Sequence, residues 1–275
     1  MVAKRSDYTG EAVEAARSVL LELSRLLGEY QDSVVVVGGW VPELLLSQAP
    51  HQHVGSIDVD IALDHRKLKE VGYKTISQLL LERGYQRGNQ PFIFFRTVQL
   101  GDQTIDVEVD FLAGEYTGTA RGHRTQKVQD MRPRKARGCD LAVNLATDVT
   151  LSGTLPGGGK DTTTIRVASI VPFLVMKAMA LAGRLMEKVS WDIYYCIRYY
   201  PGGLDRLVDE FRPHLNHGLV QEALAKISEK FASPQHVGPT HVADFEDLSD
   251  PEERAQIQRD AFEHVQELIA RLQNI

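Results

Sequence analysis

Carboxylates recur at every second position in two short segments of the chain. Asp58 and Asp60 stand in SIDVDIAL, and Glu108 and Asp110 stand in IDVEVDFL. Side chains two residues apart share one face of a β-strand, so the acids take one face and the aliphatic residues the other. Clustered carboxylates repel one another, and a divalent cation such as magnesium removes that cost. The spacing indicates a magnesium site, with the solvated face of an edge strand as the alternative for the first pair.

The second acidic segment would supply the third carboxylate of such a site. Glu108 and Asp110 point the same way, so the pattern does not distinguish between them. Three acids carried by strands are the ligand type that two-metal phosphoryl chemistry uses. The alternative from a different functional class is a non-catalytic binding module in which the acids serve only structure.

A glycine pair lies shortly before the first acids. Ser33–Val37 is predicted to be a buried strand that stops at Gly38 and Gly39, and a short helix is predicted from Trp40 to about Ser47. Glycine lets the backbone approach a ligand closely, and the free N–H groups of a first helical turn attract phosphate. The alternative is a tight connection without a ligand.

The elements that would position these residues form a mixed sheet with helices. Helices are predicted up to Gly28 and over residues 66–83, and strands over 56–63, 92–100, 104–112, 148–155 and 162–168. From Ser169 the pattern is helical almost to the end, with breaks at 201–203 and 213–218 and a loop over 233–248. We therefore expect an α+β chain, with an α/β core over residues 1–168 and a helical domain over 169–275.

Composition narrows the class of protein. The 275 residues are 43% hydrophobic and 25% charged with a net charge of −6, which argues against a disordered chain and against a surface wholly devoted to nucleic acid. The two cysteines have no metal-ligand or disulfide spacing, and no signal peptide or membrane span is evident. A cytoplasmic protein without a membrane partner is the expectation.

A local basic segment is compatible with that net charge. It contains Arg121, Arg124, Lys127, Arg132, Arg134, Lys135 and Arg137. Clustered Lys and Arg contact RNA backbones, and a solvated loop is an equally good interpretation.

Three other features are assigned no chemistry. PGGGKD is predicted to be a hairpin turn rather than a phosphate loop. The pairs His51/His53 and His214/His217 have no third ligand in register and are predicted to be exposed polar residues.

Together the motifs resemble a known superfamily. The glycine turn GGW at Gly38–Trp40, the SxDxD motif at Ser56–Asp60 and the acid Asp110 resemble the polymerase-beta-type nucleotidyltransferase core. The helical half is similar to a helix pair of the AbiEii/AbiGii toxin family, the nucleotidyltransferases of type IV toxin–antitoxin and phage-defence systems. The residues that carry this second likeness are Lys177, Arg184, Lys188, Asp192 and Tyr194.

The resemblance implies a fold, a reaction and roles for individual residues. It implies a nucleotidyltransferase fold with a C-terminal helical domain, and transfer of a nucleoside monophosphate from a triphosphate to an acceptor. Asp58, Asp60 and Asp110 would be catalytic and hold magnesium in a two-metal site. Nucleotide-binding residues would be Gly38, Gly39, Ser56, Lys177, Arg184 and Lys188, and Asp192 would orient the catalytic Lys177. A surface ion-pair cluster is the alternative for the lysine group.

The acceptor and partners follow from the toxin branch of the family. The resemblance implies RNA, in particular tRNA, as acceptor and a separate antitoxin protein as partner. The first rival is a small-molecule nucleotidyltransferase of the antibiotic-modifying kind, which would use a pocket rather than a basic surface. The two acceptor classes differ in salt sensitivity, because RNA affinity falls steeply as salt rises.

Overall fold

The chain divides into two compact units. The computed structural model describes residues 4–68, 74–115, 125–183 and 186–274. The sheet unit comprises residues 9–44 and 55–169. The helical unit runs from Ile170 onward and also includes residues 45–54 and the chain up to Tyr8. The domain boundaries predicted from the sequence instead assign residues 45–54 and the chain up to Tyr8 to the α/β core.

A mixed β-sheet forms the centre of the sheet unit. The strands are β1 (Val34–Val37), β2 (Asp58–Leu63), β3 (Gln86–Arg87), β4 (Ile93–Leu100), β5 (Gln103–Ala113), β6 (Arg134–Lys135), β7 (Ala146–Thr154) and β8 (Lys160–Ala168). Their order is β3-β4-β5-β2-β1-β8-β7, and β6 pairs with β5. Strand β2 is antiparallel to β1 and parallel to β5, and β7 and β8 form the hairpin predicted around PGGGKD. The mixed sheet with helices is thus confirmed.

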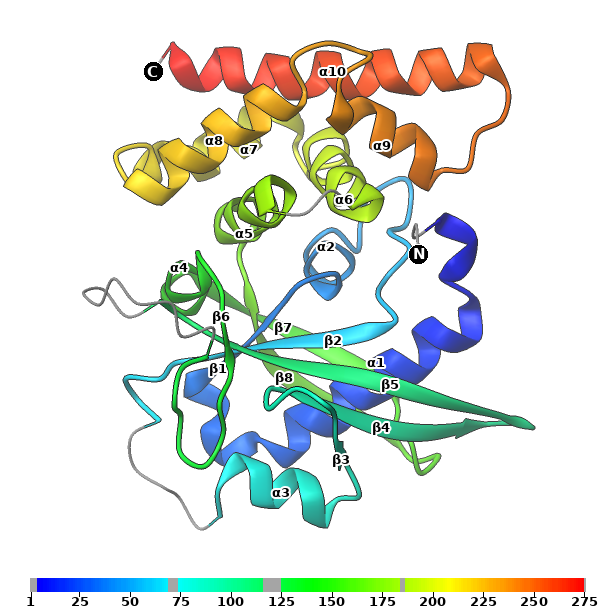
Figure 1. Ribbon diagram of the computed structural model, residues 1–275, viewed down its shortest axis with the longest axis vertical. Coiled ribbons are helices and arrows are strands. Elements are labelled where there is room, and N and C mark those ends of the chain that lie inside the picture. The colour runs from blue at the N-terminus through cyan, green and yellow to red at the C-terminus, as the bar shows by residue number, and fades with distance from the viewer. Residues whose placement is uncertain (1–3, 69–73, 116–124, 184–185, 275) are drawn as a thin grey trace. The chain divides into compact units, whose positions relative to one another are not determined.

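Helices cover both faces of this sheet. They are α1 (Gly10–Leu26), α2 (Trp40–Leu45), α3 (Ile76–Glu82) and α4 (Cys139–Asn144), with a 3-10 segment over Gly28–Ser33. Figure 1 shows α1 crossing one face and α4 lying against the other. Thr9 begins α1, since its hydroxyl accepts the N–H of Ala12, and the apolar stripe through Val19, Leu20 and Leu23 is buried.

The helical unit is a bundle built on α5 and α6. Its helices are α5 (Ile170–Gly183), α6 (Glu187–Arg198), α7 (Gly203–Phe211), α8 (Gly218–Lys230), α9 (Val237–Phe245) and α10 (Pro251–Gln273), with 3-10 segments over Arg5–Asp7 and Arg212–His214. Helix α6 packs on α9, and α5 packs on α8. Figure 1 shows α10 as the long red helix of this unit. No helix in the described parts of the chain has both the length and the apolarity that a membrane span requires.

Two predicted elements are wrong. The helix expected over residues 66–83 is shorter in the described residues, where α3 spans Ile76–Glu82 because Thr75 caps it, and 65–68 form turns. The loop expected over 233–248 contains α9, which is held by tertiary packing: its Phe245 ring lies 4.9 Å from that of Trp191 on α6.

A buried carboxylate ties α1 to the edge of the sheet. Glu22 is 2% exposed and accepts hydrogen bonds at 2.7 Å from the Nε atoms of Arg83 and Arg96. Burial acts to raise the pKa of Glu22, but the hydrogen bonds from Arg96 and Arg83 outweigh it and lower that pKa below its ordinary value. The ionised form therefore stabilises the folded unit.

We predict that Glu22→Ala lowers the free energy of unfolding by about 3 kcal/mol at pH 7, because two guanidinium groups lose their buried partner. Glu14→Ala, at an exposed position of the same helix, should change it by less than about 0.5 kcal/mol. The lowered pKa means that the Glu22 contribution is present above the unfolded pKa and lost as pH falls through the folded one. Urea unfolding at pH 7 and pH 3 measures both effects, and equal losses for the two variants would contradict the prediction.

Candidate functional site

Four carboxylates adjoin one another on neighbouring strands of the sheet unit. The parallel pairing of β2 with β5 places Asp58 in register with Glu108 and Asp60 in register with Asp110. Neighbouring strands lie about 4.8 Å apart, and side chains in register point to the same face. We call these four residues the strand carboxylates. Both acids of the second segment belong to the group, so the choice between Glu108 and Asp110 stays open.

The glycine turn lies directly against Asp60. Val37 of β1 pairs with Asp60, and the next residue, Gly38, has a φ of +69°. A Cβ atom at Gly38 would lie 1.8 Å from Oδ2 of Asp60, so the carboxylate occupies the space that a side chain would need. The structure therefore brings the predicted Gly38 and its neighbour Gly39 together with the acids.

Asp58 is held from two sides. Its side-chain Oδ1 accepts a hydrogen bond of 2.5 Å from the hydroxyl of the buried Ser56. Its backbone carbonyl accepts a bond of 2.7 Å from the indole Nε1 of Trp40, at the start of α2. The GGW and SxDxD segments are thus connected through Asp58, although eighteen residues separate Trp40 from it in the chain.

Arg134 forms an ion pair with one of the strand carboxylates, Asp110. Its Nη2 donates to Oδ2 of Asp110 at 2.6 Å, and its guanidinium carbon lies 5.9 Å from the centre of the Phe92 ring. The sequence does not indicate this pairing, because Arg134 follows Asp110 by 24 positions in a basic segment that was interpreted as an RNA contact or a solvated loop. Only the pairing of β6 with β5 brings it to the acids.

Two of the strand carboxylates have raised pKa values. Burial raises the pKa of Asp110 to about 6, although Arg134 acts to lower it, and the charges of Glu108 and Asp58 raise it further. Burial and the charge of Asp58 also raise the pKa of Glu108. Burial and mutual repulsion therefore disfavour the ionised forms of Glu108 and Asp110, and an added cation would relieve that cost.

The donor atoms suit magnesium, whereas their present arrangement is not that of a metal centre. Carboxylate oxygens are the ligands that magnesium prefers, and Oδ1 of Asp110 is buried without a hydrogen-bond partner. Among the described residues, however, no group of three or more His, Cys, Asp or Glu side chains is placed to hold a metal ion. Arg134 occupies the other oxygen of Asp110 instead.

A second charged cluster belongs to the helical unit. Asp192 of α6 is completely buried and accepts bonds from Nζ of Lys177 at 2.5 Å and Nζ of Lys188 at 2.9 Å. The side chain of Lys177 is 15% exposed and that of Lys188 is 9% exposed. The expected contact between Asp192 and Lys177 is therefore present, but this is not a surface ion pair. Arg184 lies outside the described residues.

His53 completes this cluster, and its predicted exposure is wrong. Its side chain is fully buried, with Nε2 3.0 Å from Oδ1 of Asp192. The imidazole ring lies 4.9 Å from the rings of both Trp191 and Tyr195 on α6. A polar loop residue is buried here because α6 offers it both an aromatic pocket and a carboxylate, which the local sequence around His53 does not reveal.

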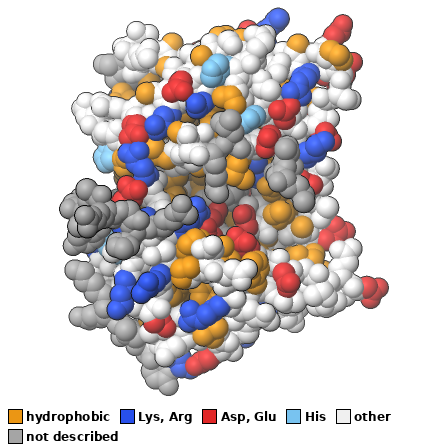
Figure 2. Space-filling model, in the orientation of Figure 1, with side chains coloured by type: hydrophobic (Ala, Val, Ile, Leu, Met, Phe, Trp, Pro, Cys, Tyr) orange, Lys and Arg blue, Asp and Glu red, His pale blue; other side chains and the backbone are white. Residues whose placement is uncertain are grey.

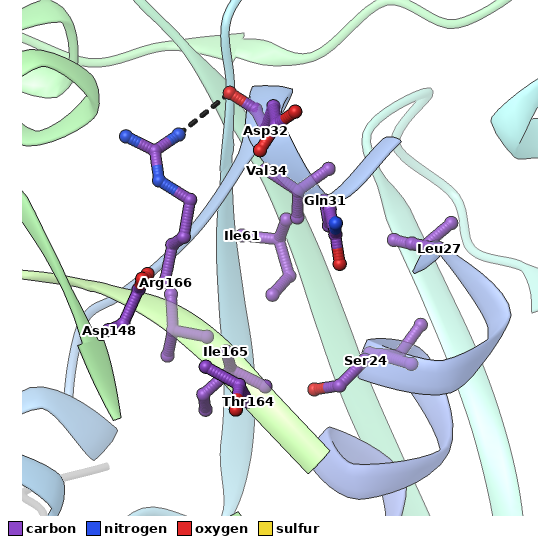
Figure 3. A pocket seen from close by; sticks show the side chains of 12 residues that line it. Ser24, Leu27, Gln31, Asp32, Val34, Ile61, Asp148, Thr164, Ile165 and Arg166 are labelled. Atoms are coloured by element: carbon purple, nitrogen blue, oxygen red, sulfur yellow. Dashed lines mark hydrogen bonds between the residues drawn. The ribbon is translucent and has the colours of Figure 1, made fainter. Parts of the chain in front are cut away.

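A cavity of about 240 Å³ lies elsewhere in the sheet unit. Figure 3 shows Ile61 of β2 and Leu27, which follows α1, among its lining residues, with Arg166 donating a bond of 2.7 Å to the backbone carbonyl of Asp32. Successive side chains of a strand point to opposite faces, so Ile61 faces away from Asp60. The cavity is therefore on the face covered by α1, and the strand carboxylates do not line it.

Charges of both signs are mixed on the molecular surface. On the face drawn in Figure 2, Lys and Arg side chains are interspersed with Asp and Glu. Within the basic segment, Arg121 and Arg124 lie outside the described residues, Arg134 is bonded to Asp110 and Arg137 lies 4.0 Å from Glu115. RNA contact by this segment stays a prediction.

Comparisons of the chain with protein-family models, curated proteins and solved structures found no match. Carboxylate oxygens on adjoining strands are the ligand type that magnesium prefers, and the backbone N–H groups of a glycine turn beside them can bind phosphate. The buried lysines and Asp192 can present one partly exposed ammonium group in a fixed position.

The contact between Gly38 and Asp60 predicts that a side chain at Gly38 destabilises the fold. Gly38→Ala should lower the free energy of unfolding by about 2–4 kcal/mol, because it adds a steric clash to the cost of a positive φ. Gly101→Ala is the matched control: Gly101 has a φ of +57° and no atom within 4 Å of the added Cβ. This control should lose only about 1–2 kcal/mol. Denaturant unfolding of both variants tests the difference, and equal losses would show that Asp60 does not fill the space at Gly38.

The burial of His53 makes a pH prediction. Burial and the charge of Lys188 lower the pKa of His53 from 6.5 to about 4, against the opposing effect of Asp192. Below pH 6.5 the unfolded chain therefore takes up a proton at His53 that the folded chain does not. The contribution of neutral His53 to the free energy of unfolding is complete above pH 6.5 and is lost progressively as pH falls from 6.5 to 4. The expected slope from this group is about 1.4 kcal/mol per pH unit.

We predict that His53→Gln removes this part of the slope, because an amide retains a donor for Asp192 but does not titrate. His214→Gln, at a partly exposed histidine of the same unit, should leave the slope in place. Free energies of unfolding between pH 4 and 7 provide the measurement. An unchanged slope in His53→Gln would refute the assignment.

Proposed function

We propose that this protein is a magnesium-dependent nucleotidyltransferase that transfers a nucleoside monophosphate from a nucleoside triphosphate to an acceptor. The observation that carries the proposal is the register of Asp58 and Asp60 with Glu108 and Asp110, beside a turn at which Gly38 contacts Asp60. A divalent cation bound there together with a polyphosphate would offset the electrostatic repulsion among these carboxylates. The resemblance of the GGW and SxDxD segments to the polymerase-beta-type core supports the same reaction.

In this proposal the strand carboxylates hold the metal. Asp58 and Asp60 would be shared ligands, and Asp110 would complete the site and help to accept the proton of the incoming hydroxyl. Bound magnesium would supply charge neutralisation at the phosphates. The backbone N–H groups of the Gly38–Gly39 turn would bind the phosphates, and Ser56 would hold Asp58 in one orientation. Positioning and electrostatics account for most of the rate gain in such reactions.

The proposal gives the helical unit a role in binding the nucleotide. Lys177 would neutralise the polyphosphate, since its ammonium group is the more exposed of the two on Asp192. Asp192 would act as a positioning residue for Lys177. Lys188 is more buried and lies 5.1 Å from the Tyr8 ring centre, so its contribution would be to keep Asp192 ionised and in place.

The acceptor that we propose is RNA, in particular tRNA, and the biological role is that of a growth-arresting toxin with a cognate antitoxin. The support is the likeness of the segment from Lys177 to Tyr194 to the AbiEii/AbiGii helix pair, together with the basic segment up to Arg137. The decisive experiment incubates purified protein with magnesium, each α-labelled nucleoside triphosphate and total RNA. A parallel reaction offers aminoglycosides in place of RNA.

We predict that wild type labels RNA, with a rate that falls steeply as salt rises, and arrests growth when induced. Asp60→Asn should reduce transfer at least about 100-fold, because it removes charge from a shared metal ligand. Asp106→Asn is the matched control, since Asp106 lies on β5, the strand that carries Glu108 and Asp110, but is exposed and accepts a hydrogen bond from Thr97. It should leave transfer unchanged.

The outcomes separate the alternatives. Labelled aminoglycoside without labelled RNA would move the acceptor to the small-molecule class. Absence of transfer to any acceptor by wild type would refute the proposed reaction. Equal activity of wild type and Asp60→Asn would remove the strand carboxylates from the mechanism.

A further inference from the structure

The ion pair between Arg134 and Asp110 lies where the proposed metal site needs a carboxylate. Nη2 of Arg134 is 2.6 Å from Oδ2 of Asp110, and the two side chains are 33% and 12% exposed. Asp110 is in register with Asp60 and adjacent to Asp58 and Glu108 on the sheet face. Arg134 therefore neutralises the acid that would complete the metal site.

The pair is incompletely satisfied on both sides. In the described structure, Oδ1 of Asp110 and Nε of Arg134 are both buried without a hydrogen-bond partner. A side-on bidentate pair, through Nε and Nη2 of the arginine, would use two parallel bonds and satisfy both of these atoms. One oxygen of Asp110 is thus held by Arg134 while the other remains available as a ligand.

A short hairpin carries Arg134 to this position. Strand β6 is only two residues long and pairs in parallel with the end of β5, where Leu112 is in register with Arg134. The hairpin is closed by the bridges Thr125–Arg134 and Val128–Met131, and Val128 and Met131 are buried. The backbone of Arg134 is fixed by these contacts, so its side chain is the part that can change partner.

We propose that Arg134 competes with the divalent cation for Asp110: it occupies this carboxylate when no cation is present and leaves it when one binds. The inference rests on the proposed function for the identity of the metal site. Two positive charges within bonding distance of one carboxylate repel each other. A guanidinium that has left Asp110 would stay tethered by β6 and could bind a phosphate oxygen of the nucleotide, for which its planar donors are suited.

The test measures Mn²⁺ affinity, by calorimetry, in wild type, Arg134→Met and the control Lys135→Met. Lys135 is the neighbouring partly exposed cation on β6. Arg134→Met should bind Mn²⁺ about tenfold more tightly than wild type, since the competitor is gone. Lys135→Met should bind within about twofold of wild type. Unchanged or weaker binding by folded Arg134→Met overturns the proposal.

A second measurement uses the intact side chain, in case Arg134→Met fails to fold. With ¹⁵N-labelled arginine side chains, the Nε–H signal of Arg134 is assigned by its loss in Arg134→Lys. Saturating Mg²⁺ should shift this signal in wild type, and Asp110→Asn should abolish the response. A signal unaffected by Mg²⁺ at concentrations that calorimetry shows to be saturating would overturn the proposal.

These readouts are independent of nucleotide transfer. If wild type transfers no nucleotide but Arg134 competes with the cation, the proposed reaction is refuted and the role of Arg134 stands. Nucleotide transfer by wild type without competition between Arg134 and the cation would refute the role of Arg134 and leave the proposed reaction standing.

Discussion

Repulsion among the strand carboxylates is the constraint around which the sheet unit is organised. Parallel pairing of β2 with β5 places four acids on one face within two steps of register. Two of them have partners on neighbouring segments, since Ser56 bonds to Asp58 and Arg134 bonds to Asp110. The raised pKa values of Glu108 and Asp110 express the remaining cost. In the proposed function, a bound cation would offset this cost.

The helical unit presents the complementary arrangement. There a single buried acid, Asp192, is surrounded by Lys177, Lys188 and His53. The two lysines lower the pKa of Asp192 far below its ordinary value, against the effect of burial. The same cations, with burial, keep His53 neutral. Residues 45–54 thereby become part of the helical unit, although the chain continues into β2 directly afterwards.

The two faces of the sheet carry different kinds of side chain. On the α1 face, apolar side chains pack and Glu22 joins Arg83 and Arg96 in a buried network. On the opposite face, Asp60 lies against Gly38. The alternation of side chains along β2 permits both, since neighbours such as Asp60 and Ile61 face different environments.

The sequence alone determined much of the fold and the identity of the acids, because both depend on local patterns. Alternation predicted β2 and β5, and glycine with a β-branched run predicted β1 and its turn. Only tertiary structure decided the register of Asp60 with Asp110, the pairing of Arg134 with Asp110 and the burial of His53. These depend on contacts between residues far apart in the chain, whose energies no local period encodes.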